Sequence, residues 1–564
     1  MDIHEVIRKH VLKNAYDYGK ASPGNIVGKI IAENPDAKKD MKTTMGLVND
    51  IVNQVNSMSK EDIEKELSNY TFEEKKEESK EITIPDAIEG EVVTRFPPEP
   101  NGWPHIGHAK AFTLSWTIAK KYNGKVILRW DDTNPEAEKK EFVDSIKEGL
   151  TWLGLDWDKE VYCSDYISKM YELCDVLIEN NDAYVCNCKQ EDIAKGRELK
   201  KRCDCGKNSV NRNFELWSKM LRGEFEEGEY IVRLRGDMSS LNTVMRDPTL
   251  FRIIKTAHYR QNNKFNVWPT YDFQGPVMDS IIGITHPIRS KEYELRDELY
   301  VYLLNKLNLR VPSMITISRL AIKNAPISKR LLRPLVESGK LWGWDDPRLP
   351  TLSGLRRKAI SPEAIKKFVL SFGISKVESE PTLEALFIEN KKIIEPVSPH
   401  YFFVSNPKKV KVINAKNEKV VMHLHPSNKE LGEKSYEVNN EFFIDENDFN
   451  SLNKDEIFRL KELYNVKIIE KKENELICEF AGKDLIQNSK KIQWVSSINF
   501  IPAIIYNFND LLKEGEFNEE SLVELKGYCE KVCEKLNEND VIQFERKGFY
   551  KLDNKKEMKF IKVD

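Results

Sequence analysis

Two histidines, His105 and His108, stand three residues apart in the stretch FPPEPNGWPHIGHAKAF, which spans residues 96–112. Prolines precede the pair and helix-forming residues follow it, so the pair falls on the first turn of a predicted helix. Side chains at i and i+3 share a helix face, and a helix N-terminus offers unpaired N–H groups to an anion. Gly107 lets a planar ring approach the backbone. The pattern indicates a phosphate cradle, although two histidines at a helix start, taken alone, are more often packing or capping residues.

A second candidate group is the basic loop NAPISKRLL at residues 324–332, which contains Ser328, Lys329 and Arg330. It follows the apolar run MITISRL, a predicted strand, and a lysine there could neutralise charge on a transferring phosphoryl group. On its own, SKR is common on solvated surfaces. The combination of HIGH with a later ISKR, separated by an inserted segment, favours phosphoryl chemistry.

Four of the nine cysteines form two Cys-x-Cys pairs, CNC and CDC. Four thiolates can hold one tetrahedral zinc ion. This spacing is less diagnostic than Cys-x-x-Cys, and the basic residues between the pairs favour thiolates, which aids both metal binding and plain reactivity. A structural zinc site and four reduced thiols near a basic surface are both open for Cys186, Cys188, Cys203 and Cys205.

Short apolar strands and one helix must position the histidines. The order EVVTRF, HIGHAKAFTLSWTIAKKY, KVILRW predicts strand, helix, strand, and strands that are apolar throughout are typical of a parallel sheet covered on both faces. The active crevice of such sheets lies at the carboxyl ends of the strands, where PPEPNGWPHIGH and DDTNPE stand. After an insertion with alternating strands, we expect NVWPTYDF and MITISRL to complete this sheet, with the helix YELRDELYVYLLNKLN between them.

The chain has 564 residues, more than one core supports, so several domains are expected. Apolar residues near its beginning have helical spacing, and the charged stretch that follows is typical of a linker. Its end consists of short strands with turn residues, as in antiparallel barrels. The expected organisation is a helical segment at 1–78, a linker at 79–90, an α/β domain at 91–183 and 256–350, an insertion at 184–255, a helical segment at 351–395 and antiparallel β-barrels at 396–564.

The charge balance and the hydropathy exclude several classes of protein. Lys plus Arg number 88 against 91 for Asp plus Glu, which excludes a uniformly basic coat for nucleic acid but not local basic patches. No apolar run is long enough for a membrane span, and the N-terminus has neither an apolar signal region nor a cleavage site. We expect a soluble, cytoplasmic protein with no membrane partner.

Long motifs in this sequence match one family. The chain resembles the class I aminoacyl-tRNA synthetases of the glutamyl/glutaminyl branch, specifically the archaeal type of glutamyl-tRNA synthetase, over nearly its whole length. It departs from the family at Trp103-Pro104, where Tyr-Leu is usual, and at Ile327, where methionine is usual, and neither change removes a reactive group. The motifs are TRFPPEPNGWPHIGHAKAF, LRWDDTNPE, WPTYDFQGPVMDSIIGITHPIRSKEYELRDELY, ISKRLLRPLVESGKLWGWDDPRLPTLSGLRRK, HLHPSNKELGE and IQWVSS.

The resemblance implies a Rossmann-like α/β catalytic domain with an acceptor-stem-binding insertion, a helical stem-contact domain, C-terminal β-barrels that bind the anticodon, and a helical N-terminal appendage. It implies that glutamate is activated by ATP with Mg²⁺ and then transferred to the terminal 2′-hydroxyl of tRNA(Glu), with tRNA(Gln) open as a second acceptor. No covalent enzyme intermediate is needed, so positioning and charge stabilisation would supply the catalysis. A monomer whose partners are ATP, L-glutamate and tRNA, without DNA, is expected.

At the nucleotide end, the resemblance assigns His105 and His108 to the ATP phosphates and Lys329 to the transition state. Their donors and charge would stabilise the negative charge that spreads over the α-phosphate. Further ATP contacts would come from Gly107, Ser328, Arg330 and Glu99, the last of which could instead meet the terminal ribose of tRNA.

At the amino-acid end, Arg95 would hold a carboxylate of the substrate, since a guanidinium can bind bidentately, and Asp131 would pair with the α-ammonium. Tyr271 matches the family's side-chain recognition tyrosine. Asp131 could also belong to a strand-ending turn, and Tyr271 could be a core aromatic. Arg289 matches an arginine of glutamyl enzymes where bacterial glutaminyl enzymes have a small neutral residue. An amide that leaves this cation unpaired would cost about 1 to 3 kcal/mol, and a surface arginine is the alternative.

The stretch LRRKAISPEAIKK at residues 355–367 carries five basic residues and one acidic residue, Glu363. It predicts a stripe that contacts the phosphates of a tRNA stem through Arg356, Arg357 and Lys358. A solvated helix face is the ordinary alternative.

Three other functions are open. The nearest is a glutaminyl-tRNA synthetase, which Arg289 opposes. A small-molecule nucleotidyltransferase also uses an HxGH cradle, but a small substrate gives no reason for the strand-rich C-terminal half. A non-catalytic tRNA-binding paralogue is opposed by intact His105, His108, Lys329 and Asp131.

Overall fold

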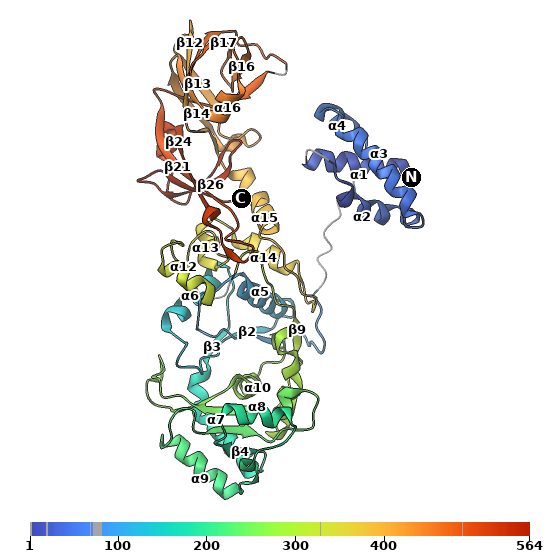
Figure 1. Cartoon of the computed structure of the whole chain (residues 1–564), viewed down its shortest axis with the longest axis vertical. Coiled ribbons are helices and arrows are strands. Elements are labelled where there is room, and N and C mark those ends of the chain that lie inside the picture. Colours follow the sequence, from blue (N-terminus) through green and yellow to red (C-terminus); the bar gives the residue numbers. More distant parts are fainter. Residues whose placement is uncertain (1–2, 19–20, 68, 71–81, 327–328, 488) are drawn as a thin grey trace. The chain divides into compact units, whose positions relative to one another are not determined.

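The computed structural model describes residues 3–18, 21–67, 69–70, 82–326, 329–487 and 489–564, and its chain divides into two compact units, Met1–Glu81 and Ile82–Asp564 (Figure 1). In the first unit, helices pack around a core that includes Val11, Ile30 and Val52. The helical spacing of these apolar residues is therefore confirmed as the basis of the N-terminal region. Its helices are α1 (Ile3–Tyr18), α2 (Pro23–Glu33), α3 (Met41–Asn56) and α4 (Lys60–Leu67).

A parallel sheet forms the centre of the catalytic region, with strand order β1-β2-β3. Thr285 N and His286 N donate to Val93 O over 3.0 and 3.1 Å, which brings a second parallel pair, β8-β9, beside β1. Strands separated by nearly two hundred residues thus meet at one sheet edge. The bounds are β1 (Val93–Phe96), β2 (Lys125–Trp130), β3 (Lys159–Tyr162), β8 (Ile288–Ser290) and β9 (Ile315–Ile317), with α5 (Ile106–Lys121) between β1 and β2 and α6 (Lys140–Trp152) between β2 and β3.

Strand β2 is apolar along its length because its side chains are covered on both faces. Leu128 and Trp130 are fully buried in one core, and Ile127 packs into another. Gly124, which precedes β2, approaches β1 so closely that an added Cβ would lie 2.0 Å from Val92 O. The predicted strand-helix-strand unit is therefore present, and glycine is required where its strands meet.

The insertion has an antiparallel sheet of its own, in the order β4-β5-β6-β7. NVWPTYDF was expected in the catalytic sheet, and this expectation is wrong: its strand β7 pairs with β6. An apolar run indicates a buried strand but does not specify the sheet that covers it. The elements are β4 (Ala183–Cys186), β5 (Ile231–Leu234), β6 (Thr249–Ile253) and β7 (Val267–Pro269), with α7 (Ile167–Glu179), α8 (Gln190–Glu198), α9 (Val210–Leu221), α10 (Tyr271–Ile281) and α11 (Asp297–Lys306) around them.

Most helices of the C-terminal half precede two seven-stranded sheets, and one short helix lies between two strands of one of these sheets. Antiparallel pairs predominate in the sheets, as predicted for barrels, but β10–β25, β12–β18, β16–β19 and β21–β27 pair in parallel. Among the described helices, none combines the length and the apolar character that crossing a bilayer requires. The helices are α12 (Lys329–Glu337), α13 (Leu352–Arg357), α14 (Pro362–Leu370), α15 (Glu384–Ile394) and α16 (Glu446–Ser451).

The two large C-terminal sheets and two small ones are each continuous in hydrogen bonding. One large sheet contains β10 (His400–Tyr401), β25 (Val541–Phe544), β26 (Gly548–Asn554), β27 (Lys559–Lys562), β21 (Phe500–Phe508), β24 (Leu522–Glu530) and β11 (Phe403–Ser405). The other contains β19 (Lys490–Ile492), β16 (Ile457–Leu460), β17 (Asn465–Lys471), β18 (Glu475–Phe480), β12 (Lys408–Ile413), β15 (Glu441–Ile444) and β20 (Trp494–Ser496). The small pairs are β13 (Glu418–His423) with β14 (Glu433–Val438) and β22 (Leu512–Lys513) with β23 (Glu516–Phe517).

The predicted basic stripe does not form one solvent-facing surface. Arg356 pairs with Glu148 on α6, whereas Arg357 donates to Asp553 of β26 over 3.2 and 2.8 Å. Lys358 is 5% exposed, so its assignment to a tRNA-contacting stripe is wrong. Consecutive helical residues point about 100° apart, and three in a row cannot share a face.

The ammonium of Lys358 is buried between the helices of residues 351–395 and the C-terminal strands. Its Nζ lies 4.4 Å from the ring centre of Phe387 and 5.0 Å from that of Phe508. Burial lowers the pKa of Lys358 to about 8, and no described carboxylate forms an ion pair with it. The charge therefore opposes folding at neutral pH.

Replacing Lys358 by an uncharged residue tests whether its buried charge opposes folding. We expect Lys358→Met to raise the free energy of unfolding by about 1 to 3 kcal/mol at pH 7, because an uncharged chain of similar length fills the same site. The gain should shrink as pH rises from about 8 to 10.5, since the folded state loses the proton first. Urea unfolding measures both effects.

Arg356→Met is the matched control, with an expected change within about 0.5 kcal/mol, because Arg356 lies in an exposed ion pair. A loss of stability in Lys358→Met would contradict the assignment of an unfavourable buried charge.

Candidate active site

A pocket of about 440 Å³ opens at the carboxyl ends of the parallel strands. Ser328 and the side chain of Lys329, both predicted in the basic loop, lie outside the described part of the structure. Arg330 of the same loop is exposed on α12 and does not line the pocket. The pocket brings together eight predicted residues from distant segments, namely Arg95, Glu99, His105, Gly107, His108, Asp131, Tyr271 and Arg289.

The two histidines cap the helix on which they stand. His105 is the N-cap of α5, and its Nδ1 accepts from Gly107 N over 3.1 Å. His108 Nδ1 accepts in turn from His105 N over 3.2 Å, and the two ring centres lie 3.9 Å apart. Because each Nδ1 is an acceptor, each neutral ring carries its proton on Nε2. Capping therefore fixes the tautomer in which Nε2–H is a hydrogen-bond donor.

Burial keeps both imidazoles uncharged at neutral pH. It lowers the pKa of His108 to about 4. The pKa of His105 lies well below its usual range because of burial and, to a lesser extent, because of His108 and Arg319. The sequence left capping and phosphate binding open as alternatives for the two histidines. Capping uses Nδ1 and phosphate binding would use Nε2, so the two roles are compatible.

Gly107 is required by the cap itself. An added Cβ would lie 2.9 Å from His105 Cε1 and 3.0 Å from Nδ1, so any side chain would displace the ring. The loop before it is also anchored: Ile106 N donates to Pro350 O, and Leu352 N donates to Pro104 O. The cradle is thus fixed to the start of α13.

Trp103 is one of the residues that differ from the usual pattern of the family that the sequence resembles. Its ring stacks on Trp344 with the centres 6.4 Å apart and meets Phe142 edge to face at 5.6 Å. The ring therefore joins the cradle loop to the segment before α13.

A buried network of charges underlies the amino-acid end of the pocket. Arg129 donates to Asp131 from Nε and Nη2, over 2.7 and 3.0 Å, and to Asp279 from Nη1, over 2.6 Å. Arg95 Nε and Tyr300 OH also donate to Asp279, over 2.7 and 2.9 Å. Burial alone would raise the pKa of Asp279, but Arg95 and Arg129 outweigh it and hold that pKa below its usual value.

Sequence reasoning missed Arg129 and Asp279. The available signal was a charge inside each of two apolar runs, KVILRW and PVMDSII, because charged residues are almost never fully buried without a partner. The pairing itself joins residues 150 positions apart and could not be read from spacing.

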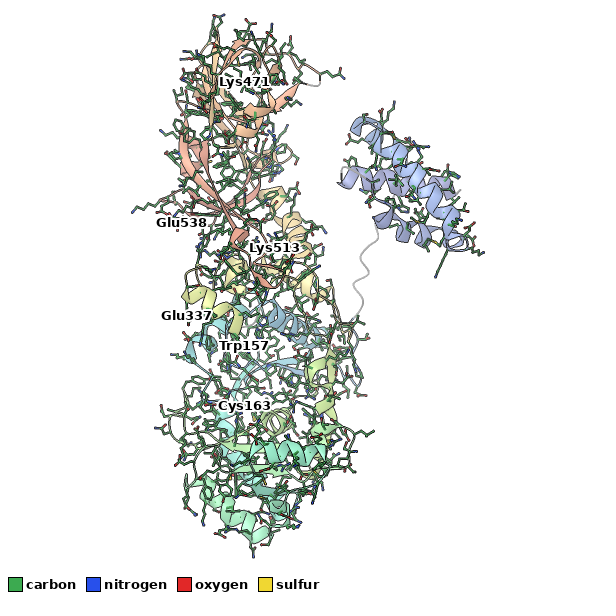
Figure 2. All side chains as sticks on the ribbon, viewed as in Figure 1. Trp157, Cys163, Glu337, Lys471, Lys513 and Glu538 are labelled. Carbon is green, nitrogen blue, oxygen red and sulfur yellow. The ribbon has the colours of Figure 1, made fainter. Side chains whose placement is uncertain are left out.

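The network changes what Arg95 can offer to a ligand. Its Nε is bonded to Asp279 and its Nη1 donates to Ile288 O over 2.8 Å, which leaves Nη2 without a hydrogen bond to a described residue. The bidentate contact expected for Arg95 is therefore not available in this arrangement. Asp131 lines the pocket, and the buried thiol of Cys163 donates to it over 3.5 Å. Cys163 is labelled in Figure 2.

Aromatic rings surround Arg289, which lies next to this network. Its guanidinium carbon lies 5.9 Å from the ring centre of Tyr271, 5.7 Å from that of Tyr293 and 5.0 Å from that of Tyr300. Arg289 is 5% exposed, which excludes the alternative of a surface arginine. Burial lowers its pKa, but Tyr271 and Asp297 outweigh this effect and raise the pKa, so the cation is permanent.

The rim and floor of the pocket contain two further polar residues. Glu99 is exposed at the rim, where Asn101 Nδ2 donates to its carboxylate over 2.7 Å. Lys110, which sequence reasoning missed, is 1% exposed and donates from Nζ to Ser318 O over 2.7 Å. It ties α5 to the segment that follows β9.

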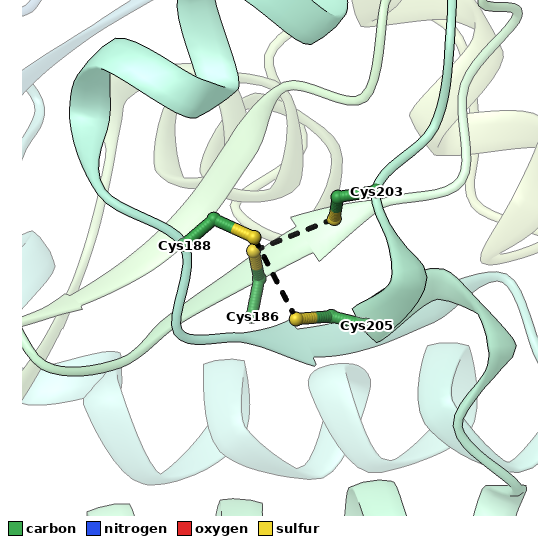
Figure 3. A group of neighbouring side chains, drawn as sticks. All are labelled: Cys186, Cys188, Cys203 and Cys205. Atoms are coloured by element: carbon green, nitrogen blue, oxygen red, sulfur yellow. Dashed lines mark hydrogen bonds between the residues drawn. The ribbon is translucent and has the colours of Figure 1, made fainter.

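A separate cluster in the insertion has the donor set of a metal site. The four Sγ atoms of Cys186, Cys188, Cys203 and Cys205 all lie within 4.8 Å of one another (Figure 3). The cross-pair distances are 3.7 Å for Cys186–Cys203 and 3.8 Å for Cys188–Cys205. Zn–S bonds of about 2.3 Å place tetrahedral sulfurs about 3.8 Å apart, so the arrangement fits zinc.

Three family models of one class match most of the chain from residue 91 onward. The family model described as "tRNA synthetases class I (E and Q), catalytic domain" matches residues 91–395, and two models for the "anti-codon binding domain" of the same class match residues 398–481 and 491–553.

Curated relatives named glutamate–tRNA ligase match over nearly their full length. The protein from Nitrosopumilus maritimus is 43% identical and that from Korarchaeum cryptofilum is 38% identical, each with 99% of both chains covered. A solved glutamate-tRNA synthetase from Elizabethkingia anophelis has 19% identity and a TM-score of 0.40, with 55% of this chain and 71% of that one covered.

The neutral state of the two imidazoles can be measured by NMR titration of ¹³C-labelled histidine, with signals assigned from His105→Asn and His108→Asn. We expect neither ring to titrate between pH 8 and about 5.5, whereas a solvated histidine titrates near 6.5. Because the unfolded chain takes up the proton first, stability should fall as pH drops from about 6.5 towards 4. A midpoint near 6.5 for either ring would contradict the capped arrangement.

Proposed function

Because the chain belongs to the class I tRNA synthetases for glutamate and glutamine, we propose that it ligates L-glutamate to tRNA(Glu) through a glutamyl-adenylate. The observation that carries the choice of glutamate is the permanent cation of Arg289, buried among tyrosines in the pocket that also contains the histidine cradle. The glutaminyl alternative is not favoured, since the full-length relatives are named for glutamate.

In the first step, an oxygen of the substrate α-carboxylate attacks the α-phosphorus of ATP. The bond from that phosphorus to the bridging oxygen breaks, and pyrophosphate leaves with its electron pair. The Nε2–H groups of His105 and His108 and the N-terminus of α5 are aligned donors for phosphate oxygens. We assign Lys329 to the transition state and Ser328 and Arg330 to ATP binding, and bound Mg²⁺ would neutralise charge on the triphosphate.

In the second step, the 2′-hydroxyl of the terminal adenosine attacks the carbonyl carbon of the adenylate, and AMP leaves. Glu99, at the exposed rim, is suited to meet either the ATP or this ribose. Asp131, whose charge Arg129 balances, is assigned to the α-ammonium, and Arg95 to a carboxylate through Nη2. The protein positions the reactants and forms no covalent bond with them.

The remaining domains are assigned to tRNA. We place acceptor-stem binding in the insertion, extended to Pro269 because β7 completes its sheet, and anticodon binding in the two C-terminal sheets. Arg356 and Arg357 remain candidates for stem contacts. We propose a monomeric, cytoplasmic enzyme. A zinc ion bound by the four cysteines would link the end of β4 to the segment 203–205 and would take no part in the reaction.

Aminoacylation tests the proposed function. We expect labelled glutamate to be charged onto purified tRNA(Glu), this activity to be lost in His108→Ala, and kcat/KM for glutamate to fall by roughly 5- to 150-fold in Arg289→Met, equivalent to about 1 to 3 kcal/mol. Arg296→Met is the control, because Arg296 pairs with Asp272 and does not line the pocket.

Labelled glutamine and tRNA(Gln) form the other arms of this experiment. Charging of glutamine alone would establish the glutaminyl alternative. Glutamate on tRNA(Gln) would identify an enzyme that serves both tRNAs. Binding of tRNA without any charging would reject catalysis.

Metal analysis tests the zinc assignment. We expect one zinc per chain, lost in Cys186→Ser and Cys205→Ser, with a lower unfolding temperature of the insertion after chelation. Cys478→Ala is the control, because Cys478 lies in the core of a C-terminal sheet. A metal-free protein with four alkylatable thiols in the cluster would favour the alternative of reduced cysteines.

A further inference from the structure

Only part of the Arg289 guanidinium is committed to the protein. Nη1 donates to the carboxylate of Asp297 and approaches Met314 Sδ at 3.4 Å. Nε is buried and has no hydrogen-bond acceptor among the described residues. A buried N–H without an acceptor costs about 1 to 3 kcal/mol. A ligand that supplied an acceptor to Nε would remove this cost.

A guanidinium can present two forks to a carboxylate, Nη1 with Nη2 or Nε with Nη2. Because Asp297 occupies Nη1, the fork left for a ligand is Nε with Nη2. The choice of fork sets the direction from which a carboxylate can approach the cation. The residue that bonds Nη1 therefore influences which acidic side chain can bind to the guanidinium.

Asp297 is well placed to hold this orientation. It is the first residue of α11, where a carboxylate is favoured by the helix dipole, and its side chain is 29% exposed. The guanidinium also lies near the rings of Tyr271, Tyr293 and Tyr300, and Tyr271 acts on it as a hydrogen-bond partner as well. Among the described residues, Asp297 supplies the charged contact that binds Nη1.

We propose that Asp297 is a positioning residue for amino-acid specificity, which holds Arg289 so that Nε and Nη2 bind the side-chain carboxylate of the substrate. This inference rests on the proposed function, because it assumes that glutamate occupies the pocket. Asp297 itself does not line the pocket and touches no substrate.

The experiment measures aminoacylation of tRNA(Glu) by the full-length protein and by Asp297→Asn, Asp297→Glu and the control Asp272→Asn. Asp272 also pairs with an arginine, Arg296, but neither residue lines the pocket. For Asp297→Asn we expect KM for glutamate to rise roughly tenfold, kcat and KM for ATP to change less than about twofold, and the preference for glutamate over glutamine to fall by a similar factor. Asp297→Glu, which restores the charge, should recover part of the loss.

A double-mutant cycle separates positioning from a general structural effect. In an Arg289→Met background, Asp297→Asn should change KM for glutamate by less than about twofold, because the group that it positions is gone. Equal losses with and without Arg289 would overturn the inference, as would an unchanged preference in Asp297→Asn.

Failure of the inference and failure of the proposed function are distinguishable. If the parent protein charges glutamate while Asp297→Asn retains its KM and preference, only the role of Asp297 is rejected. If the parent protein charges no glutamate, both are rejected.

Discussion

One buried carboxylate, that of Asp279, holds the amino-acid end of the pocket together. It accepts hydrogen bonds from Arg95 on β1, Arg129 on β2 and Tyr300 on α11, while it stands on α10. Four elements of the catalytic region therefore meet at one side chain. Removing it would leave two buried guanidinium groups with a single carboxylate, Asp131, between them, and an uncompensated buried charge is strongly destabilising. Most of the pocket geometry depends on this balance.

The same balance limits what the network can offer to a ligand. Arg95 and Asp131 are neutralised within the network, so each keeps limited hydrogen-bonding capacity. Arg289, which lies next to the network, carries a charge balanced by the partly exposed Asp297. Tyr300 connects the two groups, since its hydroxyl donates to Asp279 while its ring lies against the Arg289 guanidinium.

Sequence alone predicted the parts of this site that are local along the chain. His105, Gly107 and His108 fall within one helical turn, and their cap depends on nothing distant. The fold class was also predictable, because the apolar spacing of helices and strands is local. The partners of Arg129 and the sheet that contains β7 were not, because they are decided by which distant segments cover an apolar run. Lys358 was misassigned for a related reason: composition shows charge, but only packing shows the direction of the side chain.

The meeting of β1 with the segment before β8 has a consequence for synthesis on the ribosome. Val93 N donates to Thr285 Oγ1, which lies 192 residues later in the chain. At about 5 to 20 residues per second, roughly 10 to 40 seconds pass between the appearance of the two partners. During that interval one edge of β1 lacks its neighbour, and Arg95 and Arg129 lack Asp279. The nascent chain thus carries an unpaired strand edge, and two arginines with only the carboxylate of Asp131 to balance them, until the insertion has been made. An exposed edge of this kind is where chaperones and aggregation compete.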